Sequence, residues 1–177
     1  MMALEIRLIF SYISIFCSLI LVSSSKAQDF DWPSYGGDNG SSKYAPLSQI
    51  NAENVSRLVT AWEWESPDNA LVSDIIRDGG PMLRPGPFKA TPVVVDGSMY
   101  LPTTYGQIVS LNPVSGQINW VFDTKTYEDG RPTNLGFNVR GVAYWDGGEE
   151  KRIFFATNNS YLWSISSNRT SGRTLAD

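Results

Sequence analysis

The feature that most constrains this chain is a pattern of residues that occurs twice. The first copy runs from Asp96 to Gly116 and the second from Asp146 to Gly172. From Met99 to Asn112 the copies align without a gap at an offset of 54 residues, whereas the leading Asp-Gly pairs are offset by 50 and the trailing Ser-Gly pairs by 56. The insertions therefore fall in turns. A unit of short strands that repeats about every 40–50 residues is typical of β-propeller blades, so the sequence predicts an all-β propeller of four-stranded blades.

The first copy predicts one complete blade. Its expected strands are residues 91–95, 98–104, 107–111 and 118–122. Asp96-Gly97 joins the first two as a tight hairpin turn, because glycine tolerates the positive φ that such turns require. The second copy predicts strands at residues 141–145, 152–157 and 161–165, with no recognisable fourth strand.

The segments around the repeats are less regular. Residues 52–58 predict a short helix that Asn51 caps, with Ile50 packing on Val55 as a hydrophobic staple. Residues 58–64 predict a strand that carries Trp62 and Trp64 on one face. Residues 66–88 and 123–138 predict long loops, and loops of this length are usually functional or disordered.

The first 27 residues are typical of a secretory signal. Arg7 is followed by an apolar stretch from Leu8 to Val22, and Ser25-Lys26-Ala27 supplies small residues for cleavage. The 15 apolar residues are short for a membrane span of about 20, although an uncleaved anchor is the alternative. We therefore expect a periplasmic or secreted protein with no stable membrane span after cleavage.

Composition excludes several kinds of chemistry. The chain has no histidine, and its only cysteine, Cys17, lies in the signal segment without the small residues that a lipoprotein cleavage site requires. The chain itself therefore supplies no His-ligated metal, no Ser-His-Asp triad and no disulfide in its exported part. Without Glu5, Arg7 and Lys26 the remainder has 12 basic and 17 acidic residues, a net charge of −5. An acidic chain without a basic cluster argues against nucleic acid as a partner.

The remaining 150 residues also limit how many blades this chain provides. A blade takes about 40–45 residues and a closed propeller about 4–8 blades. The exported part, residues 28–177, therefore accounts for about three blades at most. We expect it to be the N-terminal part of a longer propeller, with a closing strand, one full blade and part of a second.

The turn at the end of the first copy carries a family motif. The stretch Ser110-Leu111-Asn112-Pro113-Val114-Ser115-Gly116-Gln117-Ile118-Asn119-Trp120 resembles the tryptophan-docking motif of pyrroloquinoline quinone (PQQ) dehydrogenases, Ala-x-Asp-x-x-Thr-Gly-Lys-x-x-Trp. Gly116 makes the tight turn, and Trp120 reaches a neighbouring blade. The sequence departs from the motif at Ser110 and Asn112, and both changes are small.

Three further stretches resemble the same family, of the glucose and alcohol dehydrogenase type. They are the segment from Trp32 to Trp62, Ala90 to Gly97, and Arg140 to Trp145. The resemblance covers about residues 31–177. It implies an eight-bladed propeller in the full-length protein, in which the segment before the first blade supplies a strand that closes the ring.

The resemblance also implies a site. Arg140 aligns with an arginine that contacts PQQ in the family, and a guanidinium grips a carboxylate of this tricarboxylate with paired hydrogen bonds. Lys89 stands where members often have an acidic or amide residue facing the cofactor. The alternatives are an Arg140 that pairs with a structural acid and a Lys89 that is simply solvated. The adjacent cysteines of many members are replaced by Asn134-Leu135-Gly136-Phe137, as in glucose-type members.

The activity implied is an exported quinoprotein dehydrogenase that oxidises a sugar or alcohol and passes electrons to a quinone or cytochrome acceptor. The resemblance implies that the Ca²⁺ ligands and the catalytic aspartate lie beyond residue 177, so this chain has no catalytic or metal residue to name and is expected to be inactive alone. Two rivals are a non-catalytic scaffold, like the outer-membrane assembly lipoproteins with similar blades, and a truncated gene whose product never closes a ring.

Overall fold

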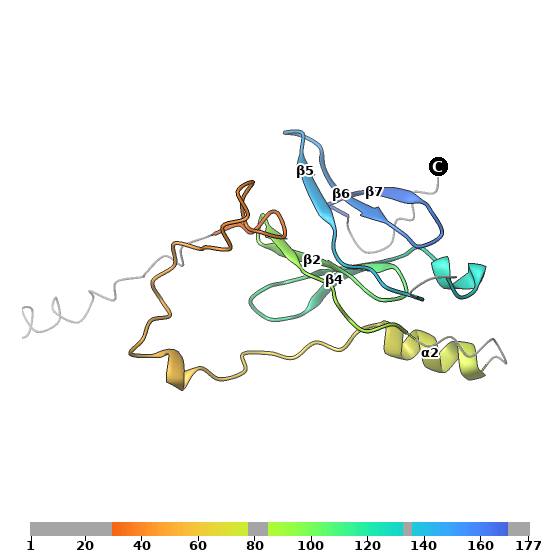
Figure 1. The fold of residues 1–177 in the computed structure, drawn as a ribbon, viewed down its shortest axis with the longest axis horizontal. Helices are drawn as coiled ribbons and strands as arrows, with labels where there is room; N and C mark the ends of the chain where they lie inside the picture. Colours follow the sequence, from red (N-terminus) through yellow and green to blue (C-terminus); the bar gives the residue numbers. More distant parts are fainter. Residues whose placement is uncertain (1–29, 78–84, 133–135, 170–177) are drawn as a thin grey trace, which may run out of the picture.

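Two antiparallel sheets form the body of the molecule in the computed structural model, which describes residues 30–77, 85–132 and 136–169. The first sheet has the order β1-β2-β3-β4 and the second β5-β6-β7 (Figure 1). The strand bounds are β1 Val93–Val95, β2 Ser98–Pro102, β3 Gln107–Leu111, β4 Ile118–Asp123, β5 Ala143–Asp146, β6 Lys151–Ala156 and β7 Leu162–Ser166. Each predicted repeat strand is present within a few residues of its expected place. The predicted signal segment lies outside the described residues.

The register of the first sheet follows from its turns. Asp96 and Gly97 form the β1–β2 turn with φ values of 49° and 69°, which confirms the expected hairpin. Val95 then pairs with Ser98. The β3–β4 ladder is regular from Gln107 to Ser110 and shifts by a bulge at Leu111, immediately before the turn of the docking motif.

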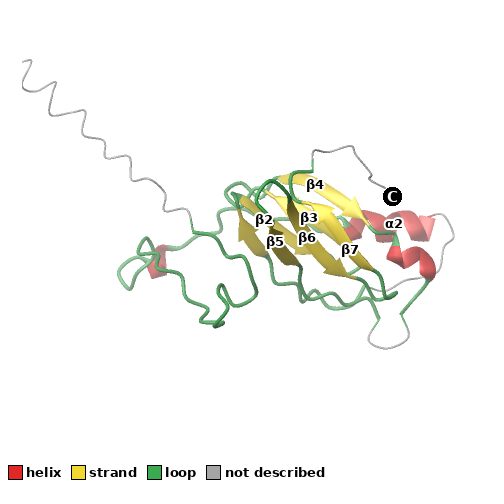
Figure 2. Ribbon diagram, turned by 90° about the horizontal axis from the view of Figure 1, so that it is seen from above, coloured by secondary structure: helices red, strands yellow, loops and turns green. Residues whose placement is uncertain are grey.

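The sheets pack face to face, as Figure 2 shows from above. Both sheets contribute to one buried apolar core: Val93, Val95, Tyr100, Ile108, Trp120, Phe122, Val139, Ile153, Phe155 and Ile165. The rings of Phe122 and Trp163 meet across it, with centroids 5.4 Å apart. Trp120 is only 5% exposed in this shared core, in agreement with a tryptophan that joins two blades.

The docking turn receives a second tryptophan from the N-terminal segment. Trp62 Nε1 donates a hydrogen bond of 3.1 Å to the Pro113 carbonyl, and its ring covers Gly116. Gly116 has φ 71°, and a Cβ there would lie 2.5 Å from Trp62 Cε3. Only glycine satisfies both the left-handed backbone and the close ring.

The prediction of a strand at residues 58–64 is wrong. No strand forms there among the described residues, and Val59 is 85% exposed. A strand requires a partner for its backbone groups, and no described strand runs beside this one. Residues 43–61, the N-terminal arm, instead lead away from the sheets (Figure 1).

In place of the helix expected at residues 52–58, the structure has a single 3₁₀ turn, η1, Val55–Arg57. Asn54, rather than Asn51, precedes it, and no side chain caps it. The Asn51 side chain accepts a bond from the Glu53 N–H instead. Ile50 and Val55 are 58% and 51% exposed, so the expected staple is wrong.

Both predicted loops contain helices. Within residues 66–88 lies α2, Asp68–Arg77, and within residues 123–138 lies the 3₁₀ helix η2, Thr126–Asp129. Pro67 stands immediately before α2, and the other prolines and glycines of this segment, from Gly79 to Pro87, follow it, so none interrupts the helix. No helix of the described residues has the length and apolar character needed to cross a bilayer.

Candidate functional site

The candidate site is built on the two lead-in segments, residues 85–92 before β1 and 136–142 before β5. They run parallel to each other, with bridges between Pro85 and Phe137 and between Thr91 and Gly141. The Thr91 N–H donates to the Arg140 carbonyl at 2.8 Å. Equivalent positions of two successive blades therefore lie side by side, which is how propeller blades meet around a common axis.

Close backbone approach fixes this pairing at its start. A Cβ on Gly86 would clash with the carbonyl oxygen of Phe137, so a glycine is required there. Phe137 is 1% exposed and belongs to the stretch that replaces the family's cysteine pair. Residues 134 and 135 of that stretch lie outside the described residues.

Arg140 is exposed at the end of the second lead-in segment. It borders an open, largely apolar pocket of about 480 Å³, together with Tyr35, Thr91, Phe155 and Leu162 among others. Its guanidinium makes no hydrogen bond or ion pair with any part of the chain that the structure describes. The alternative that it pairs with a structural acid therefore has no support among these residues.

Lys89 is exposed on the neighbouring lead-in segment, between the two bridges. The parallel register places it beside residues 139–141 of the other segment. Its ammonium group also has no partner among the described residues. The fold thus brings the two predicted site residues, 51 positions apart in sequence, to neighbouring segments at the same level.

Two cations on adjoining segments, both without partners among the described residues, suit an anionic ligand. A guanidinium offers a planar fork of donors to a carboxylate, and an ammonium adds a point charge. PQQ carries three carboxylates on a planar ring system, so the donor chemistry of Arg140 and Lys89 fits it. Within the described ranges, no three Asp, Glu, His or Cys side chains gather where they could hold a metal ion.

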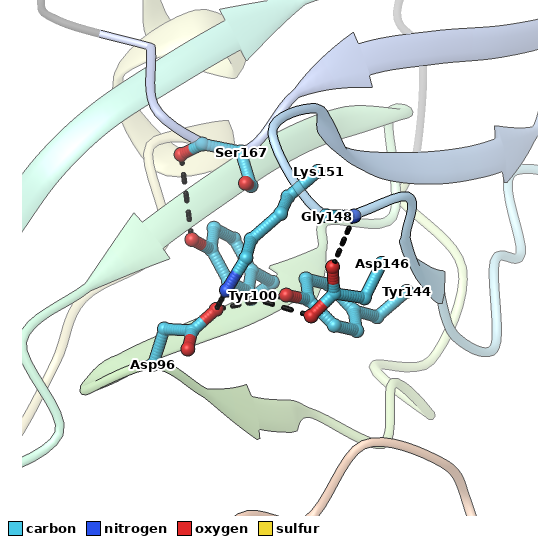
Figure 3. A network of polar contacts seen from close by, with 7 residues as sticks. All are labelled: Asp96, Tyr100, Tyr144, Asp146, Gly148, Lys151 and Ser167. Atoms are coloured by element: carbon cyan, nitrogen blue, oxygen red, sulfur yellow. Dashed lines mark hydrogen bonds and ion pairs between the residues drawn. The ribbon is translucent and has the colours of Figure 1, made fainter.

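A polar network that the sequence did not reveal joins the two sheets (Figure 3). Asp96 Oδ2, in the β1–β2 turn, accepts from Lys151 Nζ at 2.7 Å and from the Tyr144 hydroxyl at 2.8 Å. Lys151 also lies 3.5 Å from Asp146. The hydrogen bond from Lys151 lowers the pKa of Asp96. Burial, and then the bond to Asp96, raise the pKa of Tyr144 to about 12. No local pattern signals contacts between residues 48 and 55 positions apart.

Successive meander sheets, parallel lead-in segments and a tryptophan that closes over a glycine turn define a propeller of the tryptophan-docking class. A profile of the family described as "PQQ: Glucose/ethanol/alcohol dehydrogenase, beta-propeller domain" matches residues 32–176. The chain belongs to this family.

Known relatives agree with this assignment. The chain is 34% identical over 116 residues to quinoprotein glucose dehydrogenase A of Acinetobacter calcoaceticus, a match that spans 66% of this chain and 13% of the relative. It is 29% identical over 141 residues to the dehydrogenase subunit of a quinone alcohol dehydrogenase of Gluconobacter oxydans, spanning 76% of this chain and 15% of that protein.

Among solved structures, the quinohemoprotein alcohol dehydrogenase of Comamonas testosteroni superposes with a TM-score of 0.58 at 25% identity. That superposition covers 86% of this chain and 20% of the other. The chain therefore spans between about an eighth and a fifth of the length of these proteins. The shared propeller architecture confirms the predicted fold class.

Proposed function

We propose that this chain forms the opening part of the cofactor-binding propeller of an exported, PQQ-dependent dehydrogenase that oxidises a sugar or an alcohol. The observation that supports it best is the placement of Arg140 and Lys89, both without protein partners among the described residues, on adjoining lead-in segments. Bound PQQ supplies the two-electron acceptor for such an oxidation.

The roles of the chain's own residues follow from their chemistry. Arg140 binds and orients one carboxylate through paired N–H donors, and Lys89 adds a second positive charge. The Ca²⁺ of the proposed enzyme takes no ligand set from the described residues. We accordingly expect this chain alone to show no dehydrogenase activity.

The substrate and acceptor classes rest on the relatives. Their names include quinoprotein glucose dehydrogenases and a 1-butanol dehydrogenase that uses cytochrome c. We propose that this protein likewise takes a sugar or primary alcohol and passes electrons to a quinone or a cytochrome, in the periplasm or outside the cell.

The test is a PQQ titration followed by quenching of tryptophan fluorescence. We expect Arg140→Leu to weaken binding by about 10-fold or more, because a hydrogen bond to a charged group contributes about 1.5–3 kcal/mol. The matched control is Arg57→Leu, which removes another exposed arginine, on the arm. Equal affinities for the two variants would exclude Arg140 from the cofactor site, and no binding by the unmodified protein would reject the cofactor assignment for this chain.

A further inference from the structure

We infer that Asp68 is a positioning residue, which fixes α2 on the β2–β3 turn and, through Phe137, holds the lead-in segment that carries Arg140. The link to cofactor binding rests on the function proposed above. The mechanical part of the inference stands on contacts in this chain alone.

Asp68 is a buried carboxylate with donors from a distant element. Its Oδ2 accepts from the Thr104 N–H at 2.9 Å, the Thr104 hydroxyl at 2.7 Å and the Tyr105 N–H at 3.2 Å. The residue is 4% exposed, and its Oδ1 is buried without a hydrogen-bond partner among the described residues. Burying a carboxylate is costly unless donors compensate, and here the compensation comes from the turn between β2 and β3.

Such contacts differ from those of an ordinary acidic residue in a first helical turn. An aspartate at that position is stabilised by the helix dipole and by the free N–H groups of its own helix. By contrast, the Oδ2 of Asp68 accepts hydrogen bonds from Thr104 and Tyr105, which lie 36 and 37 positions further along the chain. The carboxylate therefore links two elements rather than capping one.

The apolar side of α2 packs on the same turn and on the second lead-in segment. Leu71 and Val72, three and four residues after Asp68, pack on the buried rings of Tyr105 and Phe137. These rings meet edge to face with centroids 4.8 Å apart. Residues three and four apart share one helix face, so loss of the Asp68 bonds loosens the helix face that covers Phe137.

Phe137 is close enough to Arg140 to transmit that change. The Phe137 backbone forms a bridge with Pro85, and its carbonyl oxygen lies close to Gly86. Three residues after Phe137, the Arg140 carbonyl accepts a hydrogen bond from the Thr91 N–H. Between them, Val139 is anchored in the core shared by the two sheets. The segment is thus supported on one side by α2 and on the other by the first lead-in segment.

Amide hydrogen exchange on the full chain tests this support directly. We expect Asp68→Ala to speed exchange by about 10-fold or more at Thr104 and Tyr105 and across residues 136–141. Asp68→Asn should restore much of the protection, because its amide oxygen accepts the same N–H bonds. The matched control is Asp96→Ala, which also removes a carboxylate that accepts two bonds from distant residues, here on β5 and β6. It should leave exchange across residues 136–141 unchanged.

A PQQ titration of the same variants separates the two proposals. We expect Asp68→Ala to weaken PQQ binding about 3- to 10-fold, with Asp96→Ala unchanged and Asp68→Asn close to the unmodified protein. Faster exchange at Thr104 and Tyr105 alone, with residues 136–141 still protected, would overturn the positioning role. If the unmodified protein fails to bind PQQ, the proposed function fails, while the exchange pattern still decides what Asp68 supports.

Discussion

Among the described residues, the first sheet is covered on both faces and the second on one. All five residues of β3 are buried: one face contributes to the core shared with the second sheet, and the other packs with Leu101, Met99, Val121 and Trp64. In the second sheet, by contrast, Tyr161 beside β7 is 60% exposed and Leu162 at its start 72% exposed. The same repeat thus builds two blades with different surroundings.

The difference lies in what precedes each blade. Trp62 and Trp64, on the segment before β1, cover the docking turn and the outer face of the first sheet. They occupy the place that a neighbouring blade takes in a propeller. The described residues give the outer face of the second sheet no such cover. A further layer packed on that face would therefore bury apolar side chains that are now exposed, including Leu162.

The largest expected effect comes from testing the two faces of one strand. Ile165 and Leu162 both lie on β7, but Ile165 is 5% exposed in the shared core and Leu162 is 72% exposed. We expect Ile165→Ala to lower the free energy of unfolding by about 2–5 kcal/mol. Leu162→Ala should change it by less than about 0.5 kcal/mol. Denaturant unfolding of both variants measures the difference, and similar losses would mean that Leu162 is packed in solution.

A second comparison isolates the contact between the N-terminal segment and the first sheet. Gly116 and Gly97 both have positive φ, 71° and 69°, but a Cβ meets Trp62 only at Gly116 and nothing within 4 Å at Gly97. Both alanine substitutions cost backbone strain of about 1–2 kcal/mol. Gly116→Ala should cost about 1–3 kcal/mol more, because it displaces a packed ring.

Thermal unfolding of the two glycine variants, and of each combined with Trp62→Ala, measures that excess. In the absence of Trp62 the two substitutions should cost the same. If Gly116→Ala still costs more than Gly97→Ala after Trp62 is removed, the extra cost comes from the turn itself. The proposed cover of the first sheet would then lose its main support.

The sequence predicted what its local patterns determine. Strands in the repeat and the Asp96-Gly97 turn follow from alternation and from the φ that the turn requires, and they form as expected. Trp62 and Trp64 were expected on one strand face. Both do contact the first sheet, although no strand forms there, because a strand also depends on a partner that local sequence cannot supply.

Other features were missed for different reasons. Ser66-Pro67-Asp68 is a recognisable helix start, but the prolines and glycines that follow suggested a loop throughout residues 66–88. The Asp68 bonds to Thr104, like those of Asp96 to Tyr144 and Lys151, join residues 36 to 55 positions apart. Nothing in local sequence predicts such pairs. Arg140 and Lys89 were predicted from family resemblance alone, and the fold adds only that the segments carrying them adjoin.

The smallest expected effect concerns the polar network that joins the two sheets. Because the folded-state pKa of Asp96 is lowered, chiefly by Lys151, its contribution to stability is present above the unfolded value of about 3.9 and is lost as pH falls through the lower folded value. Tyr144 behaves oppositely: its pKa is raised to about 12, so its contribution is present below about pH 10 and is lost as pH rises through 12.

Asp96→Asn should therefore lower the free energy of unfolding by no more than about 1 kcal/mol at neutral pH, since the Asp96 side chain is 51% exposed and solvent screens the pair. That difference should stay constant between about pH 5 and 9 and vanish as pH falls through the lowered folded-state pKa of Asp96. Glu128→Gln, which breaks the exposed pair with Lys125 at the start of one short helix, serves as the control with no measurable change. A difference for Asp96→Asn that persists at low pH would show that its hydrogen bonds, rather than its charge, connect the sheets.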